Sequence, residues 1–263
     1  MKIVIFQGGL GNQIFQYAVY KFIKYNICSN VQYIYIGNSH NGMEIDKYFD
    51  ADLKKAHKCF EFFYTYCHKL AKKGLNPFIS IEDDSNPFEK FFIEGYWQNK
   101  KYFGPNFLNF RIASLTPRNS QLLYRIKNEN SVAIHVRRGD YLLPQYYNIY
   151  GNVCTKDYYN KAITCIFGVF SSPSFFIFSD DISWVKENLV VDNATYIDWN
   201  TKNDSVVDMF LMSQAKGNII ANSSFSFWGA YFNQNTSLVV YPQRWYNDER
   251  EIPDIFPQTW IGI

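Results

Sequence analysis

Long apolar runs are missing from this chain. No stretch of 18 apolar residues occurs in its 263 residues, and the apolar run within "MKIVIFQGGLGNQ" at its beginning is too short for the core of a signal peptide. We therefore expect a cytoplasmic protein. Peripheral association with the inner face of a membrane is compatible with this expectation, although the sequence shows no clear basic amphipathic helix.

Charge is scarce as well. Charged residues make up 19% of the chain, the net charge is +2, and no run of five lysines or arginines occurs. So weak a field argues against a nucleic-acid partner. It is compatible with a small anionic ligand.

The sequence lacks the spacings that mark metal and disulfide sites. None of the cysteines forms a CxxC pair or neighbours a histidine at zinc-ligand spacing, so we expect free thiols and no metal. Asp50 and Asp52 form an Asp-x-Asp pattern, but they lie in a stretch that we expect to be helical. His40, His57 and His68 have no partner that the sequence identifies. The cysteines are Cys28, Cys59, Cys67, Cys154 and Cys165.

Apolar and aromatic residues are abundant. They reach 47% and 19% of the chain, which suits one large domain or two small ones. In the first half a strand, a glycine turn and a helical pattern follow one another as in half of a βαβ unit. The expected elements there are strands at 2–6, 31–36 and 91–99 and helices at 14–25 and 46–73.

Strands and helices alternate regularly in the second half. This order predicts an α/β fold with a doubly wound parallel sheet. We expect a first domain at 1–125, a second at 126–245, and a tail at 246–263 that packs back on the first domain. The expected strands are 132–136, 175–179, 195–197, 218–222 and 237–241, and the helices are 156–167, 182–189, 205–215 and 225–233.

Polar clusters follow three of these strands. In an open α/β sheet, ligands bind outside the carboxyl ends of the strands, so the clusters are expected to meet at one crevice. "HVRRGD" follows the first strand, "SDD" the second, and "NSSFS" the fourth, where it opens a helix. The residues concerned are His135, Arg137, Arg138, Asp180, Asp181, Asn222, Ser223, Ser224 and Phe225.

The chemistry of these clusters suits a nucleoside diphosphate. A planar guanidinium makes bidentate contacts with phosphate oxygens, and the start of a helix offers N–H groups to an anion. Asp180 or Asp181 could accept from a guanine or ribose edge. Each cluster also has a plain structural explanation: an ion pair of the arginines with Asp140, or a helix cap made by Asp180 or Asp181 or by the "NSSF" segment.

The glycine turn "GGLGN" lacks the spacing of a dinucleotide fingerprint and the lysine of a P-loop. A nucleotide kinase is therefore disfavoured. Glycine here would let the backbone approach a ligand, and Asn12 could present its amide to a cleft. A tight turn between strand and helix is the alternative.

Five blocks together resemble the α-1,2-fucosyltransferases, glycosyltransferase family 11. They are "GGLGNQIFQYA", "GYWQNKKYF", "HVRRGDY", "FSDDISWVK" and "NSSFSFWGAYFN", and they follow the family's order. The "HVRR" segment alone also resembles α-1,6- and protein O-fucosyltransferases.

The resemblance implies a GT-B-like fold with two facing Rossmann-like halves, the second of which binds GDP-L-fucose. It implies an inverting, metal-independent transfer, with no cofactor, to the 2-hydroxyl of a terminal galactose on a glycan that can be lipid-linked. Arg137, Arg138 and Asp140 would be catalytic, and the three polar clusters would bind the donor. Gly9, Asn12 and Gln13 would lie near the sugar and the acceptor.

The general base stays open at this stage. Asp140 is the nearest motif carboxylate, but beside two arginines it could serve only to orient them; Glu94 is the alternative. Competing functions are a fucosyltransferase of another linkage, for instance one that uses a chitooligosaccharide, and a nucleotide-sugar or glycan-binding module without turnover. Product linkage and donor hydrolysis distinguish these alternatives.

Overall fold

A computed structural model describes residues 1–37, 41–82 and 84–263, so His40 lies outside the described residues. The chain divides into two compact units, Met1–Arg111 and Ile112–Ile263. Each is an α/β unit with its own parallel sheet.

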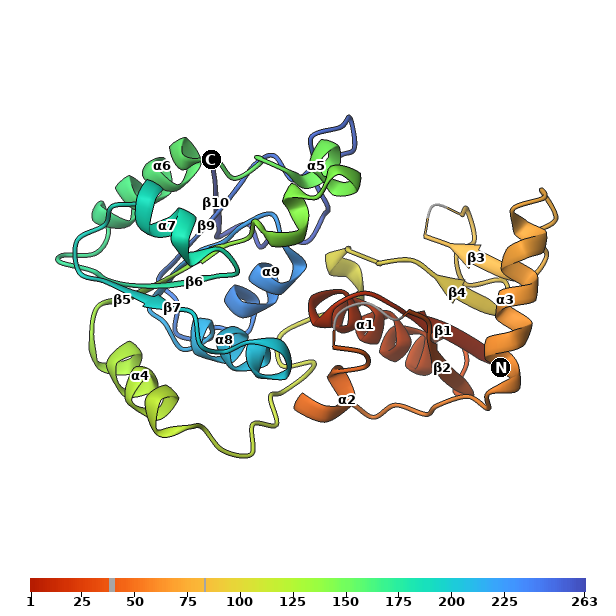
Figure 1. Ribbon diagram of the computed structural model, residues 1–263. Coiled ribbons are helices and arrows are strands. Elements are labelled where there is room, and N and C mark those ends of the chain that lie inside the picture. The colour runs from red at the N-terminus through yellow and green to blue at the C-terminus, as the bar shows by residue number, and fades with distance from the viewer. Residues whose placement is uncertain (38–40, 83) are drawn as a thin grey trace. The chain divides into compact units, whose positions relative to one another are not determined.

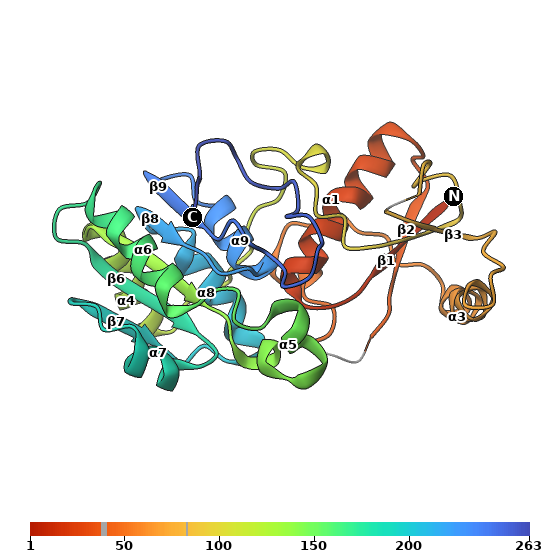
Figure 2. The same ribbon diagram turned by 90° about the horizontal axis from the view of Figure 1, so that it is seen from above.

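The first unit contains a four-stranded sheet in the order β2-β1-β4-β3. All its strand pairs are parallel. Helix α1 lies on one face of this sheet and helix α3 on the other (Figure 2). The elements are β1 (Lys2–Phe6), α1 (Leu10–Asn26), β2 (Val31–Tyr35), α2 (Ile45–Tyr48), α3 (Cys59–Ala71), β3 (Ile79–Ile81), β4 (Phe92–Glu94) and the 3-10 helix η1 (Lys100–Tyr102).

Two expectations for this unit need correction. Residues 46–73 do not form one helix: between α2 and α3 the chain runs extended beside β2, where Ala56 N donates to Tyr33 O at 2.8 Å. The strand expected at 91–99 ends at Glu94. Gly95 and Trp97 have φ angles of 154° and 58°, which a continuing strand cannot contain.

The second unit contains a six-stranded sheet in the order β10-β9-β8-β5-β6-β7, again with parallel pairs. Its strands are β5 (Ser131–Val136), β6 (Ser174–Ser179), β7 (Ala194–Ile197), β8 (Gly217–Ile219), β9 (Leu238–Tyr241) and β10 (Ile261–Gly262). Its helices are α4 (Pro117–Asn128), α5 (Pro144–Tyr150), α6 (Lys156–Phe167), α7 (Ile182–Asn188), α8 (Ser205–Met212) and α9 (Ser224–Tyr231), with 3-10 turns η2 (Gly139–Leu142) and η3 (Lys202–Asp204).

Helices cover both faces of this sheet, with α6 and α7 on one face and α4 and α8 on the other (Figure 1). Strand β5 is buried along its whole length because both faces are covered. Val132 and Ile134 pack with α6 and α7, whereas Ala133 packs with α4 and α8. The expected α/β fold with a doubly wound second sheet is confirmed.

The division between the units falls at Arg111, fourteen residues before the boundary expected at 125. Helix α4 belongs to the second unit because Leu122 and Ile126 pack in the same cluster as Ala133. The tail, expected to pack on the first half, also lies in the second unit. There β10 pairs with β9, and the Phe256 ring stacks on Tyr241 with centroids 4.0 Å apart.

Candidate functional site

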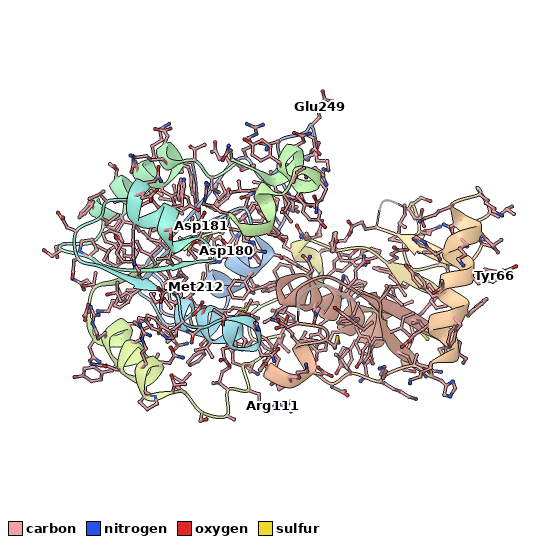
Figure 3. All side chains as sticks on the ribbon, in the orientation of Figure 1. Tyr66, Arg111, Asp180, Asp181, Met212 and Glu249 are labelled. Carbon is pink, nitrogen blue, oxygen red and sulfur yellow. The ribbon has the colours of Figure 1, made fainter. Side chains whose placement is uncertain are left out.

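The polar clusters of the second unit meet around the carboxyl end of β5. Strand β5 lies between β6 and β8, so the chain winds away from it in both directions along the sheet. Ligands of doubly wound folds bind at such a switch point. His135 lies near the carboxyl end of β5, and Arg137 and Arg138 follow this strand. Asp180 and Asp181 follow β6 (Figure 3), and the segment 222–225 follows β8.

Arg137 is held between two carboxylates. Its Nη2 is 2.7 Å from Asp140 Oδ1 and its Nη1 is 2.8 Å from Asp180 Oδ2. Burial alone would lower the pKa of Arg137, but Asp180 and Asp140 more than offset this and raise it. The guanidinium therefore keeps its charge, and its side chain is still 28% exposed.

Arg138 is oriented by two aspartates and a ring. Its Nε donates to Asp181 Oδ2 at 3.0 Å, its backbone N donates to Asp180 Oδ1 at 2.9 Å, and its guanidinium lies 4.1 Å from the centroid of the Trp184 ring. Asp181 also caps α7 by accepting from Trp184 N at 3.1 Å. The helix-cap explanation of Asp181 is thus confirmed, and the same carboxylate also holds Arg138.

His135 is almost fully buried beneath the loop. Burial lowers the pKa of its imidazole to about 4, so the ring is neutral at physiological pH. Its centroid is 5.5 Å from that of Phe225. Among the described residues, Nδ1 of His135 has no hydrogen-bond partner, which leaves one polar atom buried at the site.

In the segment after β8, Asn222 stabilises the loop and Ser223 lies at the start of helix α9. Asn222 was predicted to contact the donor, but its side chain is 2% exposed overall and serves the fold, because Nδ2 donates to Trp245 O at 3.0 Å. Ser223 is the N-cap residue of α9, yet its hydroxyl makes no capping bond within the described structure. The cap explanation of Ser223 is therefore not what the geometry shows.

Sequence reasoning missed two residues that organise this loop. The Tyr141 hydroxyl donates to Asn222 O at 3.1 Å, and Cys154 Sγ lies 3.5 Å from Asn222 Oδ1. Burial raises the pKa of Tyr141 above its usual value and that of the Cys154 thiol to about 12. Tyr141 directly follows the arginine motif, which was a usable signal; nothing in the sequence pointed to Cys154.

The residues of the glycine turn in the first unit differ in their burial and hydrogen bonding. Gly8 has φ of 77°. Gly9 is the N-cap residue of α1, and the carbonyl of Gly9 accepts hydrogen bonds from Asn12 N and Gln13 N. Asn12 is half-buried against Gly8. Gln13 is fully buried and its amide is used by the fold: Nε2 donates to Gly8 O and Gly42 O, and Oε1 accepts from Glu44 N at 2.8 Å.

A cavity of about 400 Å³ opens at the carboxyl ends of β3 and β4. Its lining includes His68 from α3, Lys72 just after that helix, Glu82 after β3, and Glu94 and Tyr96 at and after the end of β4. His68 Nε2 lies 3.7 Å from Glu94 Oε1. Burial, and then the neighbouring Glu94, raise the pKa of the Tyr64 hydroxyl, which hydrogen-bonds that carboxylate.

Within residues 1–37, 41–82 and 84–263, no group of three or more His, Cys, Asp or Glu side chains is arranged to hold a metal ion. Asp50 instead accepts from Asn109 N at 2.8 Å, and Asp52 pairs with Lys24 at 2.6 Å. The five cysteines are free thiols. None of the described helices is long and apolar enough to cross a membrane.

Each of the two units is an α/β unit with its own parallel sheet, as in the GT-B fold, and the second carries a basic site at the switch point of its sheet. A solved structure titled as NodZ α-1,6-fucosyltransferase soaked with GDP-fucose aligns with a TM-score of 0.51, covering 88% of this chain and 92% of its own, at 10% identity. That likeness concerns the fold alone.

The family model described as "Glycosyl transferase family 11" matches residues 4–263 of the chain. The chain belongs to this family, and the resemblance of its motifs is confirmed. An α-1,2-colitosyltransferase of Escherichia coli is 34% identical, with 100% of this chain and 99% of that protein covered. The mouse galactoside 2-α-L-fucosyltransferase Sec1 is 29% identical over 50% of this chain and 38% of its own length.

Proposed function

We propose that the protein is an inverting, metal-independent galactoside α-1,2-fucosyltransferase that uses GDP-L-fucose. The observation that carries the proposal is the pair of arginines at the switch point, held in place by three aspartates. Membership of glycosyl transferase family 11 and the α-1,2 linkage in the names of its relatives support the reaction class.

In the proposed mechanism the arginines bind the diphosphate. Departure of GDP leaves oxocarbenium-like charge on the sugar and negative charge on the β-phosphate, and a fixed guanidinium stabilises the latter. The oxygen of a galactose 2-hydroxyl attacks the anomeric carbon from the opposite face as the bond to GDP breaks, which inverts the configuration, and the hydroxyl proton passes to a base or to water. Asp140 fits an orienting role because Oδ1 is already bound to Arg137 at 2.7 Å.

The cavity of the first unit supports a binding site for a saccharide acceptor. The carboxylates of Glu82 and Glu94 are acceptors suited to sugar hydroxyls, and the Tyr96 ring, 41% exposed, offers an apolar face. A galactose-terminated glycan, free or lipid-linked, meets these requirements. Tyr96→Ala is expected to raise the acceptor KM about tenfold with the donor KM unchanged; an unchanged acceptor KM would contradict this assignment.

The test of the function begins with calorimetric titration of GDP, ADP and UDP in EDTA. Selective binding of GDP is expected. GDP-fucose plus lactose, followed by linkage analysis, should then yield a 2-linked fucosyl-galactose. Absence of GDP binding would overturn the assignment of the donor. GDP binding with a product of another linkage would overturn the assignment of the 2-hydroxyl as the attacking group. Donor binding without transfer or hydrolysis would favour a binding module.

A second donor deserves a direct comparison because of the 34% identity to a colitosyltransferase over the whole chain. Colitose is fucose without its 3-hydroxyl, so the two donors differ at a single position. A site that hydrogen-bonds this hydroxyl discriminates strongly against the deoxy sugar, whereas an apolar pocket does not. The ratio of kcat/KM for GDP-fucose and GDP-colitose therefore decides between the two assignments.

A further inference from the structure

Helix α3 and the residues that flank it concentrate positive charge and exposed rings. Residues 54–75 contain six lysines and one glutamate, a net charge of +5, while the whole chain carries only +2. The rest of the chain therefore has a net charge of −3. The segment is strongly basic within a nearly neutral protein, and no more than two of its lysines are adjacent in sequence, so no long charge run is visible.

The helix presents two faces of opposite character. Tyr64 and Cys67 are buried against the sheet of the first unit, in one cluster with Ile79 and Phe92. Phe62, Tyr66 and Lys69 follow one another at helical spacing on the opposite side. Tyr66 points outward from α3, away from β3 and β4 (Figure 3).

The exposure of these rings is unusual for residues of their size. The exposed fraction is 77% for Phe62 and 59% for Tyr66, and Leu75, just beyond the helix, is 63% exposed. Single exposed apolar residues are ordinary, but a group gathered on one face indicates a binding surface. Phe63 and Phe78 are 36% and 38% exposed but contact one another, and Phe63 also packs against Phe92 of the sheet, so they are not part of this outer group.

The lysines around these rings are free to interact with a partner. All six are exposed, and none forms an ion pair with another residue of the described chain. Lys69 lies within α3, whereas three of the lysines precede the helix and two follow it. These lysines are Lys54, Lys55, Lys58, Lys69, Lys72 and Lys73.

We propose that the outer face of α3 docks on an anionic phospholipid bilayer. Rings on one side of a helix enter the headgroup region, and lysines beside them pair with lipid phosphates, which is the arrangement of helices that lie in a membrane interface. Charge complementarity selects this partner, because a neutral apolar protein surface would leave the six ammonium groups without counterions. The surface goes beyond the proposed function and does not depend on it, since docking requires no turnover.

The experiment is co-sedimentation of the full chain with vesicles of phosphatidylcholine alone and of phosphatidylcholine with 30% phosphatidylglycerol. Binding is expected only to the anionic vesicles and should weaken as salt rises. Phe62→Ser with Tyr66→Ser, and separately Lys69→Glu with Lys73→Glu, should each reduce binding by roughly tenfold or more.

Matched controls lie in the second unit. Tyr124→Ser removes a ring that is 70% exposed, and Lys127→Glu with Lys156→Glu makes the same change of charge on α4 and α6. Both controls should bind vesicles like the parent chain. Thermal unfolding of all variants checks that the fold is kept, which their exposure favours.

Three results would overturn the proposal. They are absence of binding to anionic vesicles, equal loss of binding in the control and α3 variants, and binding that survives both α3 variants. Retention by a soluble polyanion such as heparin, without vesicle binding, would assign the face to an acidic macromolecule and likewise overturn it. GDP titration of the same preparations is independent of these results, so failure here and failure of the proposed function are distinguishable.

Discussion

Arg137 and Asp180 are 43 positions apart in the sequence, yet Nη1 of the arginine lies 2.8 Å from Oδ2 of the aspartate. This ion pair joins the loop after β5 to the loop after β6. Asp180 also accepts from the backbone N of Arg138 at 2.9 Å, so one carboxylate fixes the positions of both arginine residues. The charge that we assign to phosphate binding is therefore preorganised before a ligand arrives.

Asp180→Asn keeps the shape of this side chain but removes its charge. We expect GDP affinity to fall about tenfold, because the amide can still accept one bond yet no longer holds Arg137 by a charge-assisted one. Calorimetric titration measures the effect. Asp157→Asn, which breaks the exposed pair with Lys161 on α6, is the control and should leave GDP affinity unchanged. Equal affinity in the two variants would contradict the role of Asp180.

The arginines themselves should be indispensable. Arg137→Ala and Arg138→Ala are each expected to lower kcat/KM at least about 100-fold, since each removes a guanidinium that we propose to stabilise developing phosphate charge. Replacing by lysine the arginine that contacts phosphate through two nitrogen atoms should also abolish transfer, because an ammonium cannot present two parallel donors. Full activity in both alanine variants would refute the phosphate assignment; thermal unfolding verifies that the fold survives.

Gly139 is required for a steric reason. A Cβ built on it would lie 2.5 Å from Asp180 Oδ2, so Gly139→Ala must push this carboxylate away from Arg137. We expect the variant to mimic Asp180→Asn in GDP affinity while its melting temperature changes little, because Gly139 is exposed. Gly104→Ala, where nothing lies within 4 Å of the added carbon, serves as the control. Unaltered GDP binding by Gly139→Ala would show that Asp180 is free to move.

The parts of the fold that follow from periodicity were predictable. The regular alternation after Ser131 predicted strands β5 to β9 and helices α6 to α9, because parallel strands covered on both faces read as short apolar runs, but helix α5 was not predicted. Strands β3 and β10 escaped because three and two residues carry no pattern. Helix α4 escaped although Thr116 caps it and Pro117 opens it, a start signal that was present in the sequence.

The site divides in the same way. Chain order and the carboxyl-end rule were enough to bring the arginines and aspartates together, because both act through the topology of the sheet. The roles of Asn222 and Gln13 could not be read from sequence: a polar side chain beside a motif is equally able to bind a ligand or to tie down a loop. Only the hydrogen-bond partners of such a side chain in the folded structure show which of these two roles it has.

Acidification should destabilise the protein through His135. The pKa of this imidazole is about 4 in the folded protein and near 6.5 in an unfolded chain. Between these values the unfolded state binds a proton that the folded state does not, so the free energy of unfolding falls as the pH decreases through this window. The stabilisation is complete above pH 6.5 and amounts to about 3 kcal/mol at most.

Urea unfolding at pH 7 and pH 4.5 tests this linkage. In His135→Gln the difference between the two free energies of unfolding should shrink by about 2 kcal/mol relative to the parent chain. His57→Gln, at an exposed position, should leave the difference as it is. A pH dependence that is identical in all three proteins would show that His135 does not carry it.

The last prediction separates two neighbours in the glycine turn of the first unit. Gln13→Ala leaves Glu44 N without its acceptor inside a buried site and should lower the free energy of unfolding by about 2 to 4 kcal/mol. Asn12→Ala, at a half-buried position, should cost under about 1 kcal/mol but raise the acceptor KM if its amide lies near the sugar and the acceptor, as the family resemblance implies. Urea unfolding and acceptor kinetics on both variants check the pair. If Asn12→Ala left the acceptor KM unchanged, or if Gln13→Ala were as stable as the parent chain, the division of roles in this turn would be wrong.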